Sequence, residues 1–177
     1  MSKKILAFGA SSSKNSINKK FSQFAAKLFN DSEITLIDLN DFELPIYSID
    51  KEQVEIPELA HKINNIIQSS DAYIISFAEH NGAYTAAYKN IFDWVTRINK
   101  NVWNNKPMLL LSTSPGPNGA SLVLNIAHKT YAHSNSNTIA TFSLPSFYDN
   151  FDDQKGITDD KLNDDFNKTI TTFSNAL

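Results

Sequence analysis

The sequence predicts an α/β protein in which helices cover both faces of a parallel β-sheet. Short apolar runs alternate with stretches in which apolar residues recur every three or four positions, from one end of the chain to the other. The run over residues 71–77 is nearly continuous in apolar residues, which is typical of a strand that is covered on both sides. Strands and helices that alternate in this way form parallel sheets through right-handed crossovers.

Five strands and five helices account for the alternation. The expected strands cover residues 4–8, 33–39, 71–77, 108–113 and 138–142. The expected helices cover residues 17–29, a stretch that begins near Pro57, and residues 85–98, 120–131 and 158–173. Residues 38–55 and 145–157 are expected to be irregular. The fourth helix is expected to bury Leu122, Val123, Ile126 and Ala127. Five strands favour a three-layer sandwich with the flavodoxin-like strand order 2-1-3-4-5.

Composition narrows the classes of function. A chain of 177 residues fits one domain over residues 1–177. The net charge of -3 argues against non-specific nucleic-acid binding, which needs a basic surface. The sequence contains no cysteine, so thiolate catalysis, iron–sulfur clusters and cysteine-bound zinc are excluded. No apolar run approaches the length of a membrane span, and we expect a cytoplasmic protein without a membrane partner.

The loop over residues 9–18, between the first strand and the first helix, is rich in small hydroxyl side chains. The N–H groups and the dipole at the start of a helix favour an anion such as a phosphate. The loop carries neither a Walker A motif nor a G-x-G-x-x-G fingerprint. Ser16 is equally suited to cap the helix, so the loop alone leaves capping and phosphate binding open.

Two further polar loops, over residues 78–84 and 112–119, follow the third and fourth strands. In a parallel sheet all three loops meet beyond the carboxyl ends of the strands, where ligands bind. Asn81 and Gly82 are typical of a tight turn, and their exposed main chain is also suited to line a flat ring. The other histidines stand at no triad or metal-ligand spacing from His80, and the G-x-S-x-G elbow of serine hydrolases is absent.

Three segments together resemble the NADPH-dependent FMN reductase family. Residues 10–21 are similar to its phosphate loop, G-S-x-R-x-x-S-x-N-x-x-L. Residues 78–83 and 88–94 resemble its signature P-E-Y-N-G-S…L-K-N-A-L-D-W, with the spacing kept. Residues 112–116 resemble its S-T-S-P-G loop. The resemblance covers essentially the whole chain, but Ser13 stands where the family has Arg, His80 where it has Tyr, and Ala78 where it has Pro.

The resemblance implies that FMN is the bound cofactor and that NADPH or NADH is the reductant. Residues in the first loop would hold the phosphate of FMN: Ser11, Ser13, Ser16, Asn18 and, through its backbone, Ile17. Main-chain groups of the second loop would line the flavin ring: Glu79, His80, Asn81, Gly82 and Ala83. Ser114 and Gly116 of the third loop would close the site. No metal ion and no catalytic side chain are expected, because the flavin carries the redox chemistry.

The same resemblance implies hydride transfer from the nicotinamide to the flavin, and then to a small-molecule acceptor in a ping-pong scheme. Candidate acceptors are flavins, quinones, azo compounds and metal oxyanions. A homodimer or homotetramer is expected, with the helix that carries Tyr88 and Trp94 at the interface, although this aromatic stripe is also typical of a core. Two alternatives remain: a flavodoxin-like electron carrier that does not turn over NAD(P)H, and a non-catalytic binding protein of the same fold.

Overall fold

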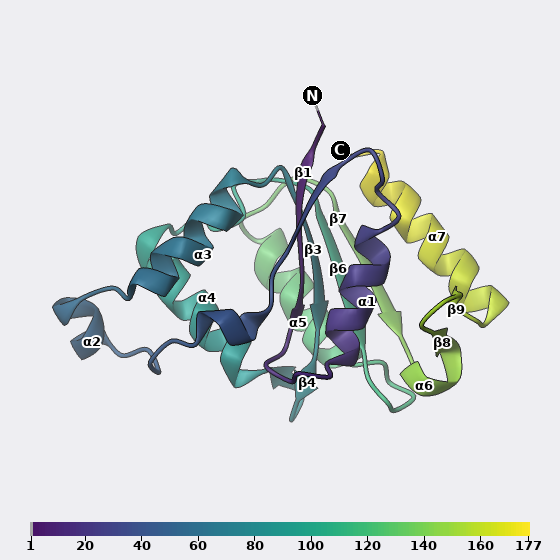
Figure 1. The fold of residues 1–177 in the computed structure, drawn as a ribbon, viewed down its shortest axis with the longest axis horizontal. Helices are drawn as coiled ribbons and strands as arrows, with labels where there is room; N and C mark the ends of the chain where they lie inside the picture. The colour runs from purple at the N-terminus through teal and green to yellow at the C-terminus, as the bar shows by residue number, and fades with distance from the viewer. Residues whose placement is uncertain (1) are drawn as a thin grey trace.

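A computed structural model describes residues 2–177, and these form a three-layer α/β sandwich (Figure 1). The central sheet has five parallel strands in the order β2-β1-β3-β6-β7. The strands are β1 (Lys4–Ala10), β2 (Glu33–Leu36), β3 (Ala72–Phe77), β6 (Met108–Thr113) and β7 (Ile139–Leu144). Counting only these five strands along the chain, the order is 2-1-3-4-5. The predicted flavodoxin-like topology is therefore confirmed.

Five long helices cover the two faces of the sheet. One face carries α1 (Ile17–Ala26) and α7 (Asp160–Ser174), and the other carries α3 (Glu58–Ser69), α4 (Ala86–Ile98) and α5 (Ser121–Ala132). Successive residues of each central strand point into opposite layers, so both layers are apolar. In β3, Ile74 packs in the α1 and α7 layer, whereas Tyr73 and Ile75 pack in the other.

Four residues of α5 were predicted to be buried, and for two of them the prediction was wrong. Leu122 is 58% exposed and Ile126 is 39% exposed, whereas Leu124 and Tyr131 are buried instead. Three apolar residues stand in a row at the start of this helix, at positions 122–124. Spacing by threes and fours fits more than one helical phase there, so it does not decide which side faces the sheet.

Short elements occupy both segments that were expected to be irregular, so that expectation was wrong. The first segment contains the 3₁₀ helix η1 (Leu39–Phe42) and the helix α2 (Ile49–Val54). The second contains the helix α6 (Phe147–Asn150) and a hairpin of β8 (Phe151–Asp152) and β9 (Gly156–Ile157). Elements this short show no hydrophobic periodicity, which is why the sequence pattern missed them.

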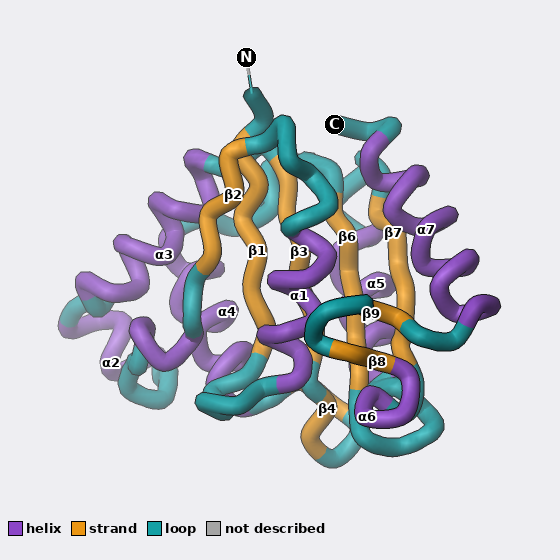
Figure 2. Tube along the Cα trace, turned by 45° about the vertical axis from the view of Figure 1, so that its right-hand side comes forward, coloured by secondary structure: helices purple, strands orange, loops and turns teal. Residues whose placement is uncertain are grey.

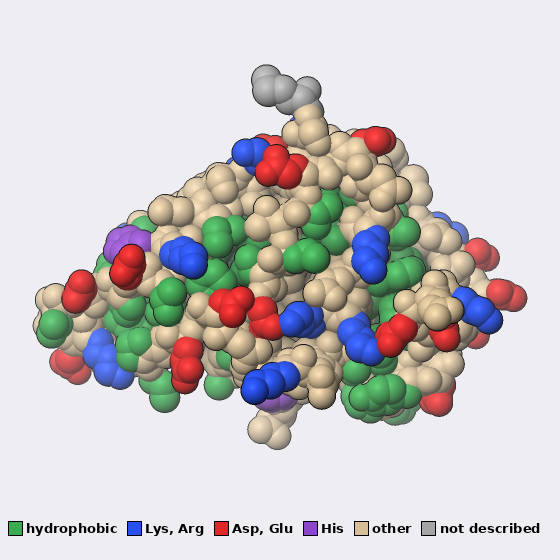
Figure 3. Space-filling model, in the orientation of Figure 1, with side chains coloured by type: hydrophobic (Ala, Val, Ile, Leu, Met, Phe, Trp, Pro, Cys, Tyr) green, Lys and Arg blue, Asp and Glu red, His purple; other side chains and the backbone are tan. Residues whose placement is uncertain are grey.

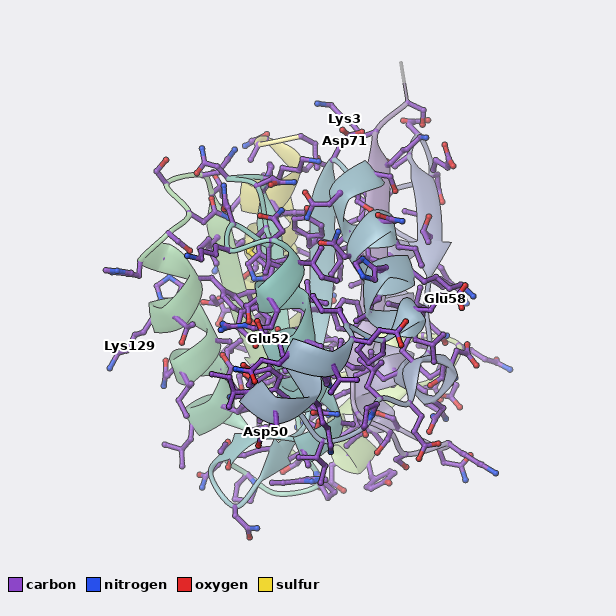
Figure 4. The ribbon with its side chains drawn as sticks, turned by 90° about the vertical axis from the view of Figure 1, so that its left-hand side faces the viewer. Lys3, Asp50, Glu52, Glu58, Asp71 and Lys129 are labelled. Carbon is purple, nitrogen blue, oxygen red and sulfur yellow. The ribbon has the colours of Figure 1, made fainter. Side chains whose placement is uncertain are left out.

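Helix α2 stands off from the body of the protein and buries none of its residues (Figure 1). Its side chains Asp50 and Glu52 are labelled in Figure 4, which views the molecule from this side. Apolar side chains gather over α2 and α3 (Figure 3), and Ile49 and Val54 of α2 are 63% and 86% exposed. Helix α2 therefore exposes apolar side chains among its charged residues Asp50, Lys51 and Glu52.

Helix α4 holds a strap, residues 44–47, that leads to α2. The Asn90 side chain donates to the Leu44 carbonyl at 3.0 Å and accepts from the Tyr47 N–H at 2.9 Å. The Trp94 ring N–H donates to the Pro45 carbonyl at 2.7 Å. Trp94 is fully buried, and the buried Tyr88 hydroxyl bonds that of Tyr131. The aromatic stripe of α4 therefore belongs to the core of this chain.

Candidate active site at the carboxyl edge of the sheet

Strands β1, β3 and β6 end side by side, because Ala10 is in register with Phe77 and Phe77 with Ser112. The loops that follow them therefore meet at one edge of the sheet, as predicted. Between them lies a hollow of about 250 Å³. Its lining comes from all three loops and from α6: Ser11, Ser13, Asn15, Ser16, Ile17, Asn18, Ala78, Glu79, His80, Thr113, Ser114, Pro115 and Tyr148.

Most of the predicted site residues line this hollow, and four do not. Asn81, Gly82 and Ala83 lie at the tip of a hairpin. Gly116 lies further along the third loop, where its carbonyl accepts the Ser146 N–H. A larger hollow of about 400 Å³ opens between η1 and α4, and none of the predicted site residues lines it. The 250 Å³ hollow is therefore the candidate active site.

The start of α1 presents unused donors to the hollow. Ser16 caps the helix, because its hydroxyl oxygen accepts the Lys19 N–H at 3.2 Å, and its own N–H donates to the Ser13 carbonyl. The capping hypothesis is confirmed, and the cap leaves the hydroxyl proton of Ser16 free to donate. Within residues 2–177 the N–H groups of Ile17 and Asn18 donate to no protein acceptor. These neutral donors at a helix start fit a phosphate.

The lysines that follow the loop are already paired. Lys19 forms an ion pair with Asp38, and Lys20 lies 2.8 Å from a carboxylate oxygen of Asp153. Burial alone raises the pKa of Asp38, but the hydrogen bonds from Lys19 and Asn40 outweigh it, and the pKa is lowered. Asp38 thus stays ionised and retains Lys19, so the donors of the first loop that line the hollow are uncharged.

Asn18 is nearly inaccessible, at 2% exposure, and its amide is engaged with the protein. Its nitrogen donates to the Thr113 carbonyl at 3.0 Å. Its oxygen accepts the Ser76 hydroxyl at 2.7 Å and the Thr113 N–H at 3.0 Å. The side chain therefore joins the first turn of α1 to the ends of β3 and β6. The amide oxygen and one amide N–H of Asn18 are thus used within the part of the protein that the structure describes, whereas its main-chain N–H is not.

The second loop forms a hairpin of β4 (Glu79–His80) and β5 (Ala83–Tyr84). Asn81 and Gly82 turn it with φ of 53° and 75°, as a type I′ turn requires. The predicted tight turn is confirmed. The exposed His80 lines the hollow, and a carboxylate oxygen of Glu79 accepts the Val123 N–H of α5 at 3.0 Å.

The third loop brings in a residue that the sequence pattern did not reveal. The Phe147 N–H donates to the Ser114 carbonyl at 3.0 Å, and the Ser146 N–H donates to the Gly116 carbonyl at 2.9 Å. These bonds hold α6 at the end of the sheet that also carries the β4 hairpin (Figure 2). Tyr148, which is 71% exposed, thereby lies at the rim of the hollow. Its segment carried no motif, so no sequence signal pointed to it.

A parallel sheet of this order, with N–H groups free of described protein acceptors at a helix start and a hollow at its carboxyl edge, is typical of a flavodoxin-like protein. Residues 3–149 match the model of the NADPH-dependent FMN reductase family, and the chain belongs to this family. Family membership makes it an oxidoreductase that uses FMN as cofactor and NAD(P)H as reductant. The neutral donors of the first loop fit the phosphate of that cofactor.

Known proteins resemble the chain over much of its length. An uncharacterized protein of Mycoplasma pneumoniae is 30% identical over 164 residues, 90% of this chain and 97% of that protein. A quinone reductase of Pseudomonas putida is 31% identical over 108 residues, 60% of this chain and 57% of that enzyme. The structure of FerB, a flavoenzyme NAD(P)H:(acceptor) oxidoreductase of Paracoccus denitrificans, is 26% identical, with a TM-score of 0.73 over 98% of both chains.

No helix described between residues 2 and 177 combines the length and apolar composition that crossing a bilayer requires. Over the same residues, no three His, Asp or Glu side chains gather as a metal site would need.

Proposed function

We propose that the protein moves hydride from NAD(P)H to bound FMN and then to a small acceptor, in two half-reactions that use the same site in turn. The observation that carries this proposal is the hollow at the carboxyl edge, where N–H groups free of acceptors among the described residues lie beside a hairpin whose residues His80, Asn81 and Ala83 are exposed. Bound FMN supplies the redox chemistry. The similar quinone reductase supports a quinone as acceptor, and flavins, azo compounds and metal oxyanions are the other candidates.

Each loop has a distinct part in this proposal. The hydroxyls of Ser11, Ser13 and Ser16 and the N–H groups of Ile17 and Asn18 hold the phosphate. The main chain of residues 79–83 lines the flavin ring, with residues 79 and 80 inside the hollow and residues 81–83 continuing beyond it at the tip of the hairpin. Ser114 and Gly116 shape the third side, where their carbonyls fix α6 and its Tyr148.

Spectroscopy and kinetics test the proposal directly. We expect the purified protein to show the absorbance of bound flavin, or to gain thermal stability when FMN is added. NADH or NADPH should then bleach the flavin absorbance without oxygen, and a quinone should restore it. Parallel lines in double-reciprocal plots should follow from the ping-pong scheme. A colourless protein whose melting temperature ignores FMN would contradict FMN binding, and bound flavin that neither nucleotide bleaches would indicate an electron carrier.

Restoring the arginine of the family pattern should tighten FMN binding. In Ser13→Arg, a guanidinium next to the phosphate adds a charge-assisted hydrogen bond, worth about 1 kcal/mol at this exposed position, or roughly a five-fold lower Kd. Riboflavin, which has no phosphate, should bind as before. Flavin fluorescence titration measures both ligands, and added salt should weaken the gain.

Ser12→Arg is the matched control for this substitution. It adds the same charge one residue earlier, where the side chain lines the hollow beside η1 instead. An equal gain in both variants, or an equal gain for FMN and riboflavin, would show that position 13 does not face the phosphate.

We propose further that the chain forms a homodimer or homotetramer, with α4 near the interface. The exposed apolar residues Ile46, Ile49 and Val54, on the strap that α4 holds and on the adjoining α2, support this proposal. Sedimentation velocity measures the assembly, and a monomer at micromolar concentration would contradict it. Since NAD(P)H is a cellular reductant, we also propose a cytoplasmic location.

A further inference from the structure

Helix α5 begins without a capping side chain of its own. The residue before it, Ala120, has a φ of 60° and makes no side-chain hydrogen bond to the helix. The Val123 N–H, at the third position of the helix, donates instead to the Glu79 carboxylate, 44 residues earlier in the sequence, at 3.0 Å. This is one of the N–H groups that an N-cap side chain ordinarily accepts.

We propose that Glu79 is a positioning residue, whose side chain caps α5 from outside the helix and thereby fixes the β4–β5 hairpin beside the flavin. The proposal rests on the proposed function, in which this hairpin lines the flavin ring. The Glu79 side chain acts on the cofactor through the hairpin, by holding it in place. A carboxylate at this point also suits the positive end of the α5 dipole.

The hairpin needs such an anchor because its own pairing is short. Only two residue pairs form it, Glu79 with Tyr84 and His80 with Ala83. Two-stranded hairpins of this length are at best marginally stable alone. At its tip, a Cβ added to Gly82 would lie 3.8 Å from a methyl carbon of Leu122, so the tip lies against the first turn of α5.

The same bond connects two of the three loops at the site. Glu79 belongs to the loop after β3, whereas α5 follows directly on the loop after β6, which contains Ser114 and Gly116. A hairpin released from α5 would change its distance from the third loop. The hairpin that lines the flavin ring and the third loop, which closes the hollow, would then be displaced relative to each other. The phosphate donors at the start of α1 would stay in place.

Two variants distinguish the effect of the capping hydrogen bond from the effect of the negative charge. Glu79→Gln keeps an oxygen at the same reach and removes the charge, whereas Glu79→Asp keeps the charge on a side chain that is one methylene shorter. Glu79→Gln still offers an oxygen to the Val123 N–H, so we expect it to keep the cap and to lose less flavin affinity than Glu79→Asp. We expect Glu79→Asp and Glu79→Ala to lower the affinities for FMN and for riboflavin by the same factor, roughly five-fold. The factor is the same because the lost cap releases the hairpin that lines the flavin ring, which both ligands contain.

Hydrogen exchange of the flavin-free protein gives a readout that needs no cofactor. Residues 79–84 and the Val123 amide should exchange faster in Glu79→Asp and Glu79→Ala, and at the parent rate in Glu79→Gln. If Glu79→Ala does not fold, the Gln and Asp variants still decide the question. Unchanged exchange in Glu79→Asp, or a loss in Glu79→Gln as large as in Glu79→Asp, would overturn the proposal. A parent protein that bound no flavin would refute the proposed function and leave the exchange test intact.

Discussion

Replacing Gly9 with alanine should lower the free energy of unfolding by about 3 kcal/mol or more, since overpacking against a rigid backbone is costly. A Cβ at this position in β1 would lie 2.4 Å from the Lys19 nitrogen and 2.8 Å from the Asn18 carbonyl carbon. These are backbone atoms of the first turn of α1, which cannot rotate away. The strand and the helix would have to separate, and the phosphate donors would move with the helix. Urea unfolding followed by circular dichroism measures the loss.

Gly116→Ala is the matched control for this substitution. A Cβ there would meet only the Ser114 hydroxyl, at 4.0 Å, so we expect the stability to change by less than about 1 kcal/mol. Similar losses in the two variants would show that close packing between β1 and α1 is not what requires glycine at position 9.

Asn18→Ala should have the second-largest effect, on stability and on flavin binding together. The substitution leaves the Thr113 N–H and carbonyl and the Ser76 hydroxyl without their buried partner. Each such group costs about 1–3 kcal/mol, so a loss of about 3 kcal/mol is expected. The first and third loops would no longer be held at a fixed separation. The affinities for FMN and for riboflavin, measured by fluorescence titration, should therefore fall by the same factor.

Ser16→Ala provides the contrast for Asn18→Ala. The Ser16 hydroxyl faces the proposed phosphate site, so its removal should lower the affinity for FMN and leave the affinity for riboflavin nearly unchanged. If Asn18→Ala also weakened FMN alone, the amide of Asn18 would be a direct phosphate ligand, and our assignment of it to the protein scaffold would be wrong.

Strand order and the meeting of three loops were predictable from the sequence. The central strands are buried on both faces, and their apolar runs are correspondingly long, as in residues 108–113. Once these strands are parallel, the loops after them must meet at one edge. The orientation of α5 was not predictable, because Leu122, Val123 and Leu124 follow one another without a polar residue between them.

Predictions about the site were accurate for the position of the loops and less so for what the side chains do. Ser16 proved to be a cap that still has a proton to donate, so two interpretations that looked like alternatives are compatible. Asn18 and Glu79 bind protein groups that are 95 and 44 residues away in sequence. Local patterns carry no information about such partners, and the same holds for Tyr148, which α6 brings to the rim.

The residues by which the chain most resembles its family need not report on the reaction that it performs. Asn90 and Trp94 of the Lys-Asn-x-x-Asp-Trp signature bind main-chain groups of residues 44–47, and Lys89 pairs with Asp93 along the helix. All four side chains serve the architecture. A related protein that bound no flavin would still need these four side chains to keep its fold. The signature therefore identifies the family, and the residues that act on the cofactor lie in the loops.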